Sequence, residues 1–469
     1  MNVILPLESE RLETADTASR LEVFLAEREE ELIEFRRDVH AHPELGRREL
    51  RTTAKLAERL EAAGLKPRPL PGGAGLVCDI DPVGAAPSQA RINGTPLDEL
   101  DLDLAPLALD AGIDHAHLDV HGVRGEAAAS LLDSPISHTA HCGGRLGIRA
   151  DIDALPIQEA DVLPFRSTVD GVSHACGHDI HTATVLGAGL FLAEQARVGR
   201  LTQPVRLIFQ PAEEVLPGGA LDMIEAGALD GVARIIGVHC DPRVDAGHIG
   251  LRPGPLTAAC DKIAIKLTGP GGHTSRPHLT VDLVYALASL VTELPAALSR
   301  RIDPRAGVSL VWGAINAGHA ANAIPQHGEA HGTVRCMDQR AWSLAPDLLL
   351  ELVDSVASVY GAKTELNYVR GVPPVVNDEH VVDLMREAAH LALAAPGAAG
   401  PDGVVPVEQS MGGEDFSWYL QKVPGAMARL GVRTPGDPTP RDLHQPTFLA
   451  DEAAIAVGVR FFAHTALLG

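Results

Sequence analysis

The stretch SHACGHDIH, from Ser173 to His181, places three histidines and one cysteine within nine residues. Its Cys176 and His178 stand two positions apart, and a thiolate beside an imidazole suits zinc, manganese, cobalt or nickel. A structural zinc site would need a second Cys/His pair at similar spacing, and we find none in the sequence. The stretch therefore predicts either a metal site for chemistry or polar side chains that bind no metal.

Two adjacent glutamates, Glu213 and Glu214, follow the apolar run in IFQPAEEVLPGG. Two neighbouring negative charges at the end of a buried strand repel each other, so a favourable interaction must offset this cost. If one carboxylate coordinates a metal, the other can take a proton from a metal-activated water. The alternative is that the pair opens the following helix, where acidic residues are favoured by the helix dipole.

His239 ends the hydrophobic run in IIGVHCDP, and His444 stands in DLHQPTF near the end of the sequence. A single histidine in such a position is more often a neutral, hydrogen-bonded residue than a metal ligand. The polar clusters follow predicted strands or begin predicted helices, and open α/β sheets bind ligands at those positions. Taken together, the weak signals indicate a metal site at one edge of a sheet.

The elements that must position these residues follow an α/β pattern. Apolar spacing predicts two helices between residues 17 and 63, with Pro43 in the loop between them. Strands are predicted at residues 75–80, 204–210 and 233–239, and residues 144–159 are predicted as a strand with its exit loop. Helical segments are predicted from residues 181 and 218. This alternation predicts a mostly parallel sheet covered by helices.

The pattern changes near Lys262, where a strand, a helix and two further strands could form a small α+β domain by themselves. We therefore predict catalytic segments at residues 1–261 and 372–469, with a separate domain inserted at residues 262–371. Residues 81–141 are rich in acidic side chains and do not fit a compact core. They are either a solvated excursion or a segment that handles metal or binds a partner.

The net charge of −23, from 62 acidic and 39 basic residues, disfavours nucleic acid as a partner. We find no run of eighteen apolar residues and no secretion signal in the acidic N-terminal segment, so we expect no membrane association and a cytoplasmic location. The six cysteines lack the spacing of a disulfide framework.

Ordered motifs across nearly the whole chain resemble the metal-dependent amidohydrolases related to hippurate hydrolase, indoleacetyl-amino-acid hydrolase and N-acetyl-diaminopimelate deacetylase. These enzymes belong to a larger clan with carboxypeptidase-like and aminoacylase-like members. The motifs are RRDVHAHPELGRRE, LGIRADIDALPIQE, SHACGHDIHTATVLGAG, IFQPAEE, GVHCDP, GPGGHTSRPH, NAIP, GTVR and MGGEDF.

The resemblance implies a site for two divalent ions, Mn²⁺ or Zn²⁺ with Co²⁺ and Ni²⁺ as alternatives. It also implies that Cys176 bridges the ions, that Glu213 is the general base, and that Asp153 orients the site. The implied ligands are Cys176, His178, Glu214, His239 and His444.

For the inserted domain, the resemblance implies a lid that also forms a homodimer. His273 matches a histidine that stabilises the reaction's oxyanion, in its own subunit's site or in the partner's. Asn322 and Arg335 match groups that hold a substrate carboxylate. The implied reaction is hydrolysis of a small N-acyl amino acid or related N-acylated amine. A dipeptidase or carboxypeptidase of the same clan, and a non-catalytic metal-binding homologue, are the alternatives.

Overall fold

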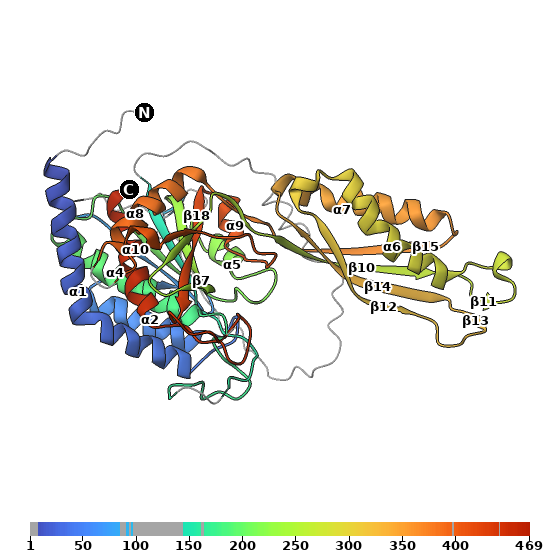
Figure 1. The fold of residues 1–469 in the computed structure, drawn as a ribbon, viewed down its shortest axis with the longest axis horizontal. Coiled ribbons are helices and arrows are strands. Elements are labelled where there is room, and N and C mark those ends of the chain that lie inside the picture. Colours follow the sequence, from blue (N-terminus) through green and yellow to red (C-terminus); the bar gives the residue numbers. More distant parts are fainter. Residues whose placement is uncertain are drawn as a thin grey trace.

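The computed structural model describes residues 8–84, 91–92, 95–96, 144–160, 164–395, 398–439 and 441–469. Most of the acidic segment 81–141 lies outside these ranges, so its role stays a prediction. Figure 1 shows a large domain joined to an elongated small domain, which projects away from it. None of the helices described is long and apolar enough to cross a membrane.

The large domain is built on a mixed, mostly parallel sheet with the order β1-β2-β6-β5-β7-β18-β8-β17. Neighbours are parallel from β6 through β5 and β7 to β18, and again between β8 and β17. The strands are β1 (Arg68–Pro69), β2 (Leu76–Ile80), β5 (Arg145–Asp151), β6 (Val205–Gln210), β7 (Val232–Asp245), β8 (Ile249–Leu251), β17 (Val404–Pro406) and β18 (Gly425–Arg433). The predicted fold class is confirmed.

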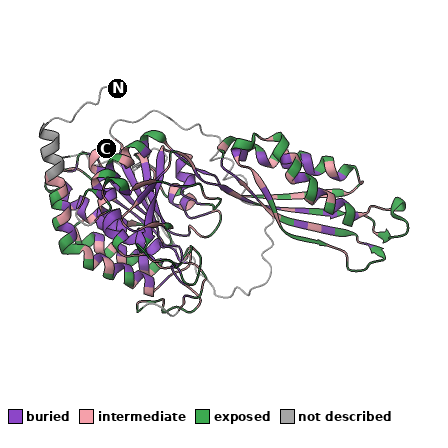
Figure 2. Cartoon of the chain, viewed as in Figure 1, coloured by how far each residue is buried: buried purple, intermediate pink, exposed green. Residues whose placement is uncertain are grey.

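Helices cover both faces of this sheet, because successive strand residues point to opposite sides and both sides are apolar. One core contains residues of α1 (Glu8–Ala41), α2 (Leu50–Ala62), α4 (His178–Arg197), α8 (Glu379–Leu393) and α10 (Ala453–Leu468). The other core contains residues of α5 (Ala220–Glu225) and α9 (Ser417–Leu420). Figure 2 shows the buried residues concentrated around the large sheet.

The small domain is an antiparallel sheet with two helices on one face. Its strand order is β12-β14-β10-β15, and alternate residues of β10 are buried against α6 and α7. The sequence prediction omitted α7 and β15, which complete this domain. The elements are β10 (Ala259–Thr268), α6 (Leu283–Arg301), β12 (Ser309–Ala317), β14 (His327–Cys336), α7 (Gln339–Ser358) and β15 (Lys363–Val372).

Short elements complete the described chain. The pairs are β3 with β4, β9 with β16, and β11 with β13. They are β3 (Arg91–Ile92), β4 (Thr95–Pro96), β9 (Gly254–Thr257), β11 (Gly272–His273), β13 (Ala323–Ile324) and β16 (Val375–Asn377), with single 3₁₀ turns at Pro277–Leu279, Pro304–Ala306 and Pro401–Gly403.

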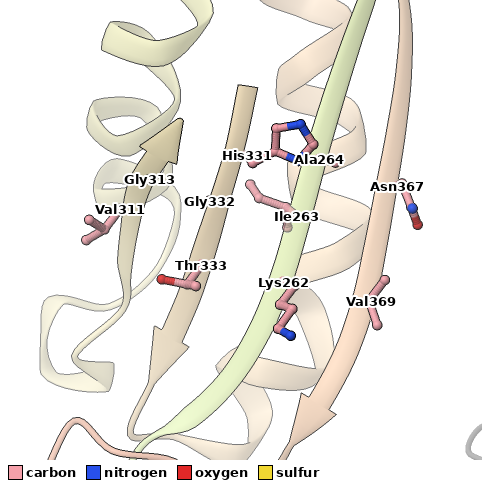
Figure 3. A pocket seen from close by; sticks show the side chains of 10 residues that line it. All are labelled: Lys262, Ile263, Ala264, Val311, Gly313, His331, Gly332, Thr333, Asn367 and Val369. Carbon is pink, nitrogen blue, oxygen red and sulfur yellow. The ribbon is translucent and has the colours of Figure 1, made fainter. Parts of the chain in front are cut away.

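The small domain's sheet leaves its second face without a helix cover. A hollow of about 370 Å³ lies on this face, lined by residues such as Lys262, Val311, His331 and Val369 (Figure 3). The lining residues all belong to the small domain, so the hollow is separate from the predicted metal ligands of the large domain.

Candidate metal centre and active site

The first predicted ligands, Cys176 and His178, flank the start of α4. Gly177 lies between them with φ of 85°, a conformation that favours glycine. A Cβ atom at this position would approach the Cys240 sulfur to 2.7 Å. Glycine therefore allows the thiol and the imidazole to stand on either side of a tight turn, against β7.

Cys176, His178 and His239 form the first group, with ligand atoms that all lie within 4.8 Å of one another. His239 Nε2 lies 3.5 Å from Cys176 Sγ, while its Nδ1–H donates to the carbonyl oxygen of Cys240 at 2.7 Å. This backbone bond places the proton on Nδ1, so the Nε2 lone pair faces the cluster.

A second group consists of Cys176, Glu214 and His444, again within 4.8 Å. His444 Nε2 lies 3.1 Å from Glu214 Oε1. The backbone N–H of His444 donates to the carbonyl oxygen of Ala175 at 2.8 Å, which ties the C-terminal segment to the turn before α4. Because Cys176 belongs to both groups, the donors suit two ions that share one thiolate.

His178 gives a direct test of whether these residues fit a cation. Its Nδ1–H donates to Asp153, to the carbonyl oxygen at 2.9 Å and to Oδ1 at 3.2 Å. Its Nε2 is buried and has no hydrogen-bond partner in the part of the chain that the structure describes. Burial lowers the pKa of His178, but Asp151 and Asp153 more than offset this and raise it to about 10. The cluster therefore favours positive charge at its centre.

The thiol of Cys176 supports the same interpretation. Burial, together with Glu214 and Glu213, raises the pKa of this thiol well above its ordinary value. Without a cation the thiol keeps its proton, and binding of a cation would release that proton. The donor set and its charge therefore fit divalent metal ions.

Asp153 links the two loops that carry the candidate ligands. Besides contacting His178, its Oδ2 accepts a hydrogen bond from the backbone N–H of Glu214 at 3.0 Å. Through these contacts, the segment after β5 positions both the start of α4 and the loop after β6. These contacts would allow Asp153 to orient both segments, and its role in the reaction stays a prediction.

Glu213 lies beside the ligands, with Oε2 3.9 Å from His178 Nε2. Burial, followed by the neighbouring carboxylates Glu414 and Glu214, raises the pKa of Glu213 well above its ordinary value. A carboxyl group with this environment can accept and hold a proton at neutral pH, which general acid–base chemistry requires.

Sequence reasoning did not assign a role to the buried charges beneath the cluster. Arg149 is fully buried and contacts Asp151 at 2.6 Å and Asp415 at 2.8 Å. Its Nη2 also lies 3.2 Å from Glu414. The acid pair in MGGEDF was a possible signal, but only the fold reveals that Arg149 of β5 contacts all three of these carboxyl groups.

The three predicted lid residues lie in two places. His273 is in β11, and the backbone N–H of Thr274 donates to the Asn322 carbonyl oxygen at 3.3 Å. Figure 1 shows β11 and β13 at the end of the small domain that is far from the large domain. The structure thus brings His273 and Asn322 together, but not to the metal ligands of the same chain. Arg335, in contrast, donates to the carbonyl oxygen of Met411 in the large domain.

The model of peptidase family M20/M25/M40 matches residues 147–468. A Bacillus subtilis (strain 168) protein named N-acetyl-L-cysteine deacetylase is 33% identical over 95% of this chain and 89% of its own length. Thermostable carboxypeptidase 2 of Saccharolobus solfataricus is 31% identical over 96% of this chain and 98% of its own length.

A Rhodococcus jostii (strain RHA1) protein named putative glutamate–cysteine ligase 2-3 is 42% identical over 92% of this chain. The chain spans only 46% of that relative's length. Among solved structures, the Bacillus subtilis YxeP protein, named a dinuclear metal binding peptidase from the M20 family, has a TM-score of 0.70 and 30% identity. That match covers 95% of this chain and 98% of YxeP.

Proposed function

The chain belongs to peptidase family M20/M25/M40 and is a hydrolase of that family, and we propose that it cleaves the amide bond of an N-acyl amino acid or a related N-acylated amine. The observation that carries this proposal is the pair of ligand groups that share Cys176, with Glu213 beside them. The similarity to a deacetylase acting on an N-acetylated amino acid supports this choice of substrate class.

We assign the metal ligands as Cys176, His178, Glu214, His239 and His444, with Mn²⁺ or Zn²⁺ as the expected ions and Co²⁺ or Ni²⁺ as alternatives. When bound, two such ions would polarise the amide carbonyl and lower the pKa of the attacking water. Glu213 takes the proton from this water and later delivers it to the leaving amine. Asp153 holds His178 and the backbone of Glu214 in place for this step.

The small domain contributes the remaining groups in this proposal. His273 stabilises the oxyanion of the tetrahedral intermediate, and Asn322 with Arg335 holds the substrate carboxylate. The location of His273 at the distal end of the small domain supports a homodimer in which one subunit supplies this histidine to its partner's site. We further propose a cytoplasmic enzyme that acts without nucleic acid or membrane.

The second candidate function is a carboxypeptidase or dipeptidase with the same metal chemistry, which the similarity to thermostable carboxypeptidase 2 favours. The two functions differ in the group that occupies the acyl side of the scissile amide. A free α-amino group there marks a dipeptide, and an acetyl or benzoyl group marks an N-acyl amino acid.

The experiment that tests the proposal combines elemental analysis with hydrolysis assays. N-acetyl amino acids, N-benzoyl amino acids and dipeptides are offered to the chain with and without added Mn²⁺ or Zn²⁺. We expect metal-dependent release of the free amino acid from one acyl class. Faster cleavage of dipeptides would favour the second candidate, and bound metal without turnover of any substrate would contradict both.

A further inference from the structure

Arg429 lies beside the metal-ligand cluster on the neighbouring strand. β18 runs parallel to β7, and Arg429 is the register partner of His239. Paired residues of parallel strands point to the same face of a sheet, so Arg429 shares the face from which His239 reaches Cys176. The core contains Val238 and Cys240, with Ala428 and Leu430, on the opposite face, as this alternation requires.

The guanidinium of Arg429 is buried and unpaired. The residue is only 6% exposed, and its Nε is buried without a hydrogen-bond partner. Across the described ranges, no hydrogen bond or salt bridge to this side chain is found, whereas Arg149 in the same interior contacts three carboxylates. A buried cation without a partner is costly, so its retention needs a reason.

The two acids that interact electrostatically with Arg429, Asp241 and Glu414, are already engaged with other residues. Asp241 accepts from the guanidinium of Arg243 at 3.0 and 2.8 Å. Glu414 lies 3.2 Å from Arg149 and also accepts from the backbone N–H of Phe416. Arg429 is therefore not required as the direct partner of either carboxylate.

The other side of Arg429 is formed by a glycine. Gly250 of β8 is its register partner there, and a Cβ atom at Gly250 would lie 3.1 Å from the Arg429 Cβ and 2.2 Å from a Val407 methyl group. The strand next to Arg429 thus carries no side chain at this level. In the sheet, Arg429 is thus flanked by His239 on one side, and by Gly250 with the nearby Val407 side chain on the other.

We propose that Arg429 binds a carboxylate of the substrate next to the scissile amide. This inference rests on the proposed function and assigns a further substrate-binding residue to the same site. The planar guanidinium can donate two parallel hydrogen bonds to a carboxylate, and burial strengthens such a charged pair. Arg335 is a separate group on β14 of the small domain, where its guanidinium donates to the Met411 carbonyl oxygen.

Two parts of a substrate could supply this carboxylate. It is either the α-carboxylate of the amino acid product or the distal carboxylate of a dicarboxylic acyl group. Three compounds separate the two sources: N-acetylalanine carries the first, N-succinylalaninamide carries the second, and N-acetylalaninamide carries neither. The shared chemistry is a carboxylate within a few bonds of the amide.

The test measures kcat and KM for these three compounds with the metal-loaded chain and with Arg429→Gln. We expect the substitution to raise KM by roughly 10- to 100-fold for the compound that carries the recognised carboxylate, the size of effect that loss of a charged hydrogen bond gives. KM for N-acetylalaninamide should change by less than about 3-fold. Arg429→Lys, which keeps the charge but loses the planar fork, should give an intermediate KM.

The matched control is Arg433→Gln, which removes one positive charge from an exposed arginine on the same strand that pairs with Asp245. Elemental analysis verifies that each variant binds the same amount of metal as the parent. Equal changes in KM for all three compounds, or no change for any, would overturn the proposal. The selective increase must also be absent from Arg433→Gln.

A binding measurement separates this inference from the proposed reaction. Calorimetry with the metal-loaded Glu213→Gln chain measures Kd for the same three compounds, with and without Arg429→Gln. If the parent hydrolyses none of them but Arg429→Gln weakens binding of only one carboxylate compound, the reaction is wrong and Arg429 is still a carboxylate-binding residue. If hydrolysis occurs but Kd shows no such selectivity, the role of Arg429 is wrong.

Discussion

The imidazole of His181 and the carboxylate of Asp151 form a hydrogen bond of 2.5 Å beside the candidate metal ligands His178 and His239. On its other side, His181 Nε2 accepts a hydrogen bond from the backbone N–H of Cys240 at 2.8 Å. Both ring nitrogens are therefore engaged, the proton is on Nδ1, and His181 connects β5, α4 and β7. These two hydrogen bonds give His181 a structural role, so a histidine in the SHACGHDIH stretch need not be a metal ligand.

Replacing His181 with phenylalanine should destabilise the chain because both hydrogen bonds of the imidazole are lost and the larger phenyl ring must fit the same buried position. Asp151 and the Cys240 N–H would remain buried without these partners, at a cost of about 1–3 kcal/mol for an unsatisfied group. Urea unfolding of the parent and of each variant measures the change in the free energy of unfolding. The matched control is His380→Phe at an exposed position of α8. An equal loss in both variants would contradict the role of His181.

Replacing Glu213 with glutamine should leave the metal content unchanged but lower kcat by at least about 100-fold, because the general base is removed. Elemental analysis and single-substrate kinetics give the two readouts. The assignment is wrong if the variant retains normal turnover. A variant that loses both metal and turnover would instead identify Glu213 as a ligand.

Mixing two inactive variants tests whether His273 acts in the partner's site. A heterodimer of Glu213→Gln and His273→Ala has one site with an intact Glu213 and an intact histidine from the other subunit. Random mixing should therefore restore about one quarter of the parent activity. If His273 acts within its own subunit, no mixed dimer contains a complete site and activity stays at the level of the separate variants.

Glu49 should make the metal-depleted chain less stable as the pH rises. Its Oε1 accepts from the backbone N–H of Ala212 at 2.7 Å, and burial, with a contribution from Asp153, raises its pKa from 4.5 to about 7. The folded chain therefore holds a proton that the unfolded chain has lost, and stability falls between pH 4.5 and 7.

The shifted pKa of Glu49 changes the free energy of unfolding by at most about 3 kcal/mol. Glu49→Gln should remove this pH dependence while keeping the hydrogen bond from the backbone N–H of Ala212. Urea unfolding of the metal-depleted parent and variant at pH 5 and pH 8 measures how the free energy of unfolding of each depends on pH. The variant should gain stability relative to the parent at the higher pH. An identical difference at both pH values would contradict the shifted pKa of Glu49.

Local sequence patterns were sufficient to predict much of the large domain. The apolar run in Val205–Gln210 forms the fully buried β6, as its composition indicates. The small domain was predicted less completely, because α7 contains an internal proline at Pro346 and β15 alternates with many polar residues. Burial against α6 and β10 stabilises these segments, and that support comes from residues far away in the chain.

The sequence by itself determined which donor types are available and that Cys176, His178, Glu213 and Glu214 follow elements typical of a ligand-binding edge. Only the tertiary structure decided how they combine. Strand order places β18 beside β7 and therefore Arg429 beside His239, although about 190 positions separate them. The physical reason is that local propensity acts over a few residues, whereas pairing of charges and hydrogen bonds depends on which strands become neighbours.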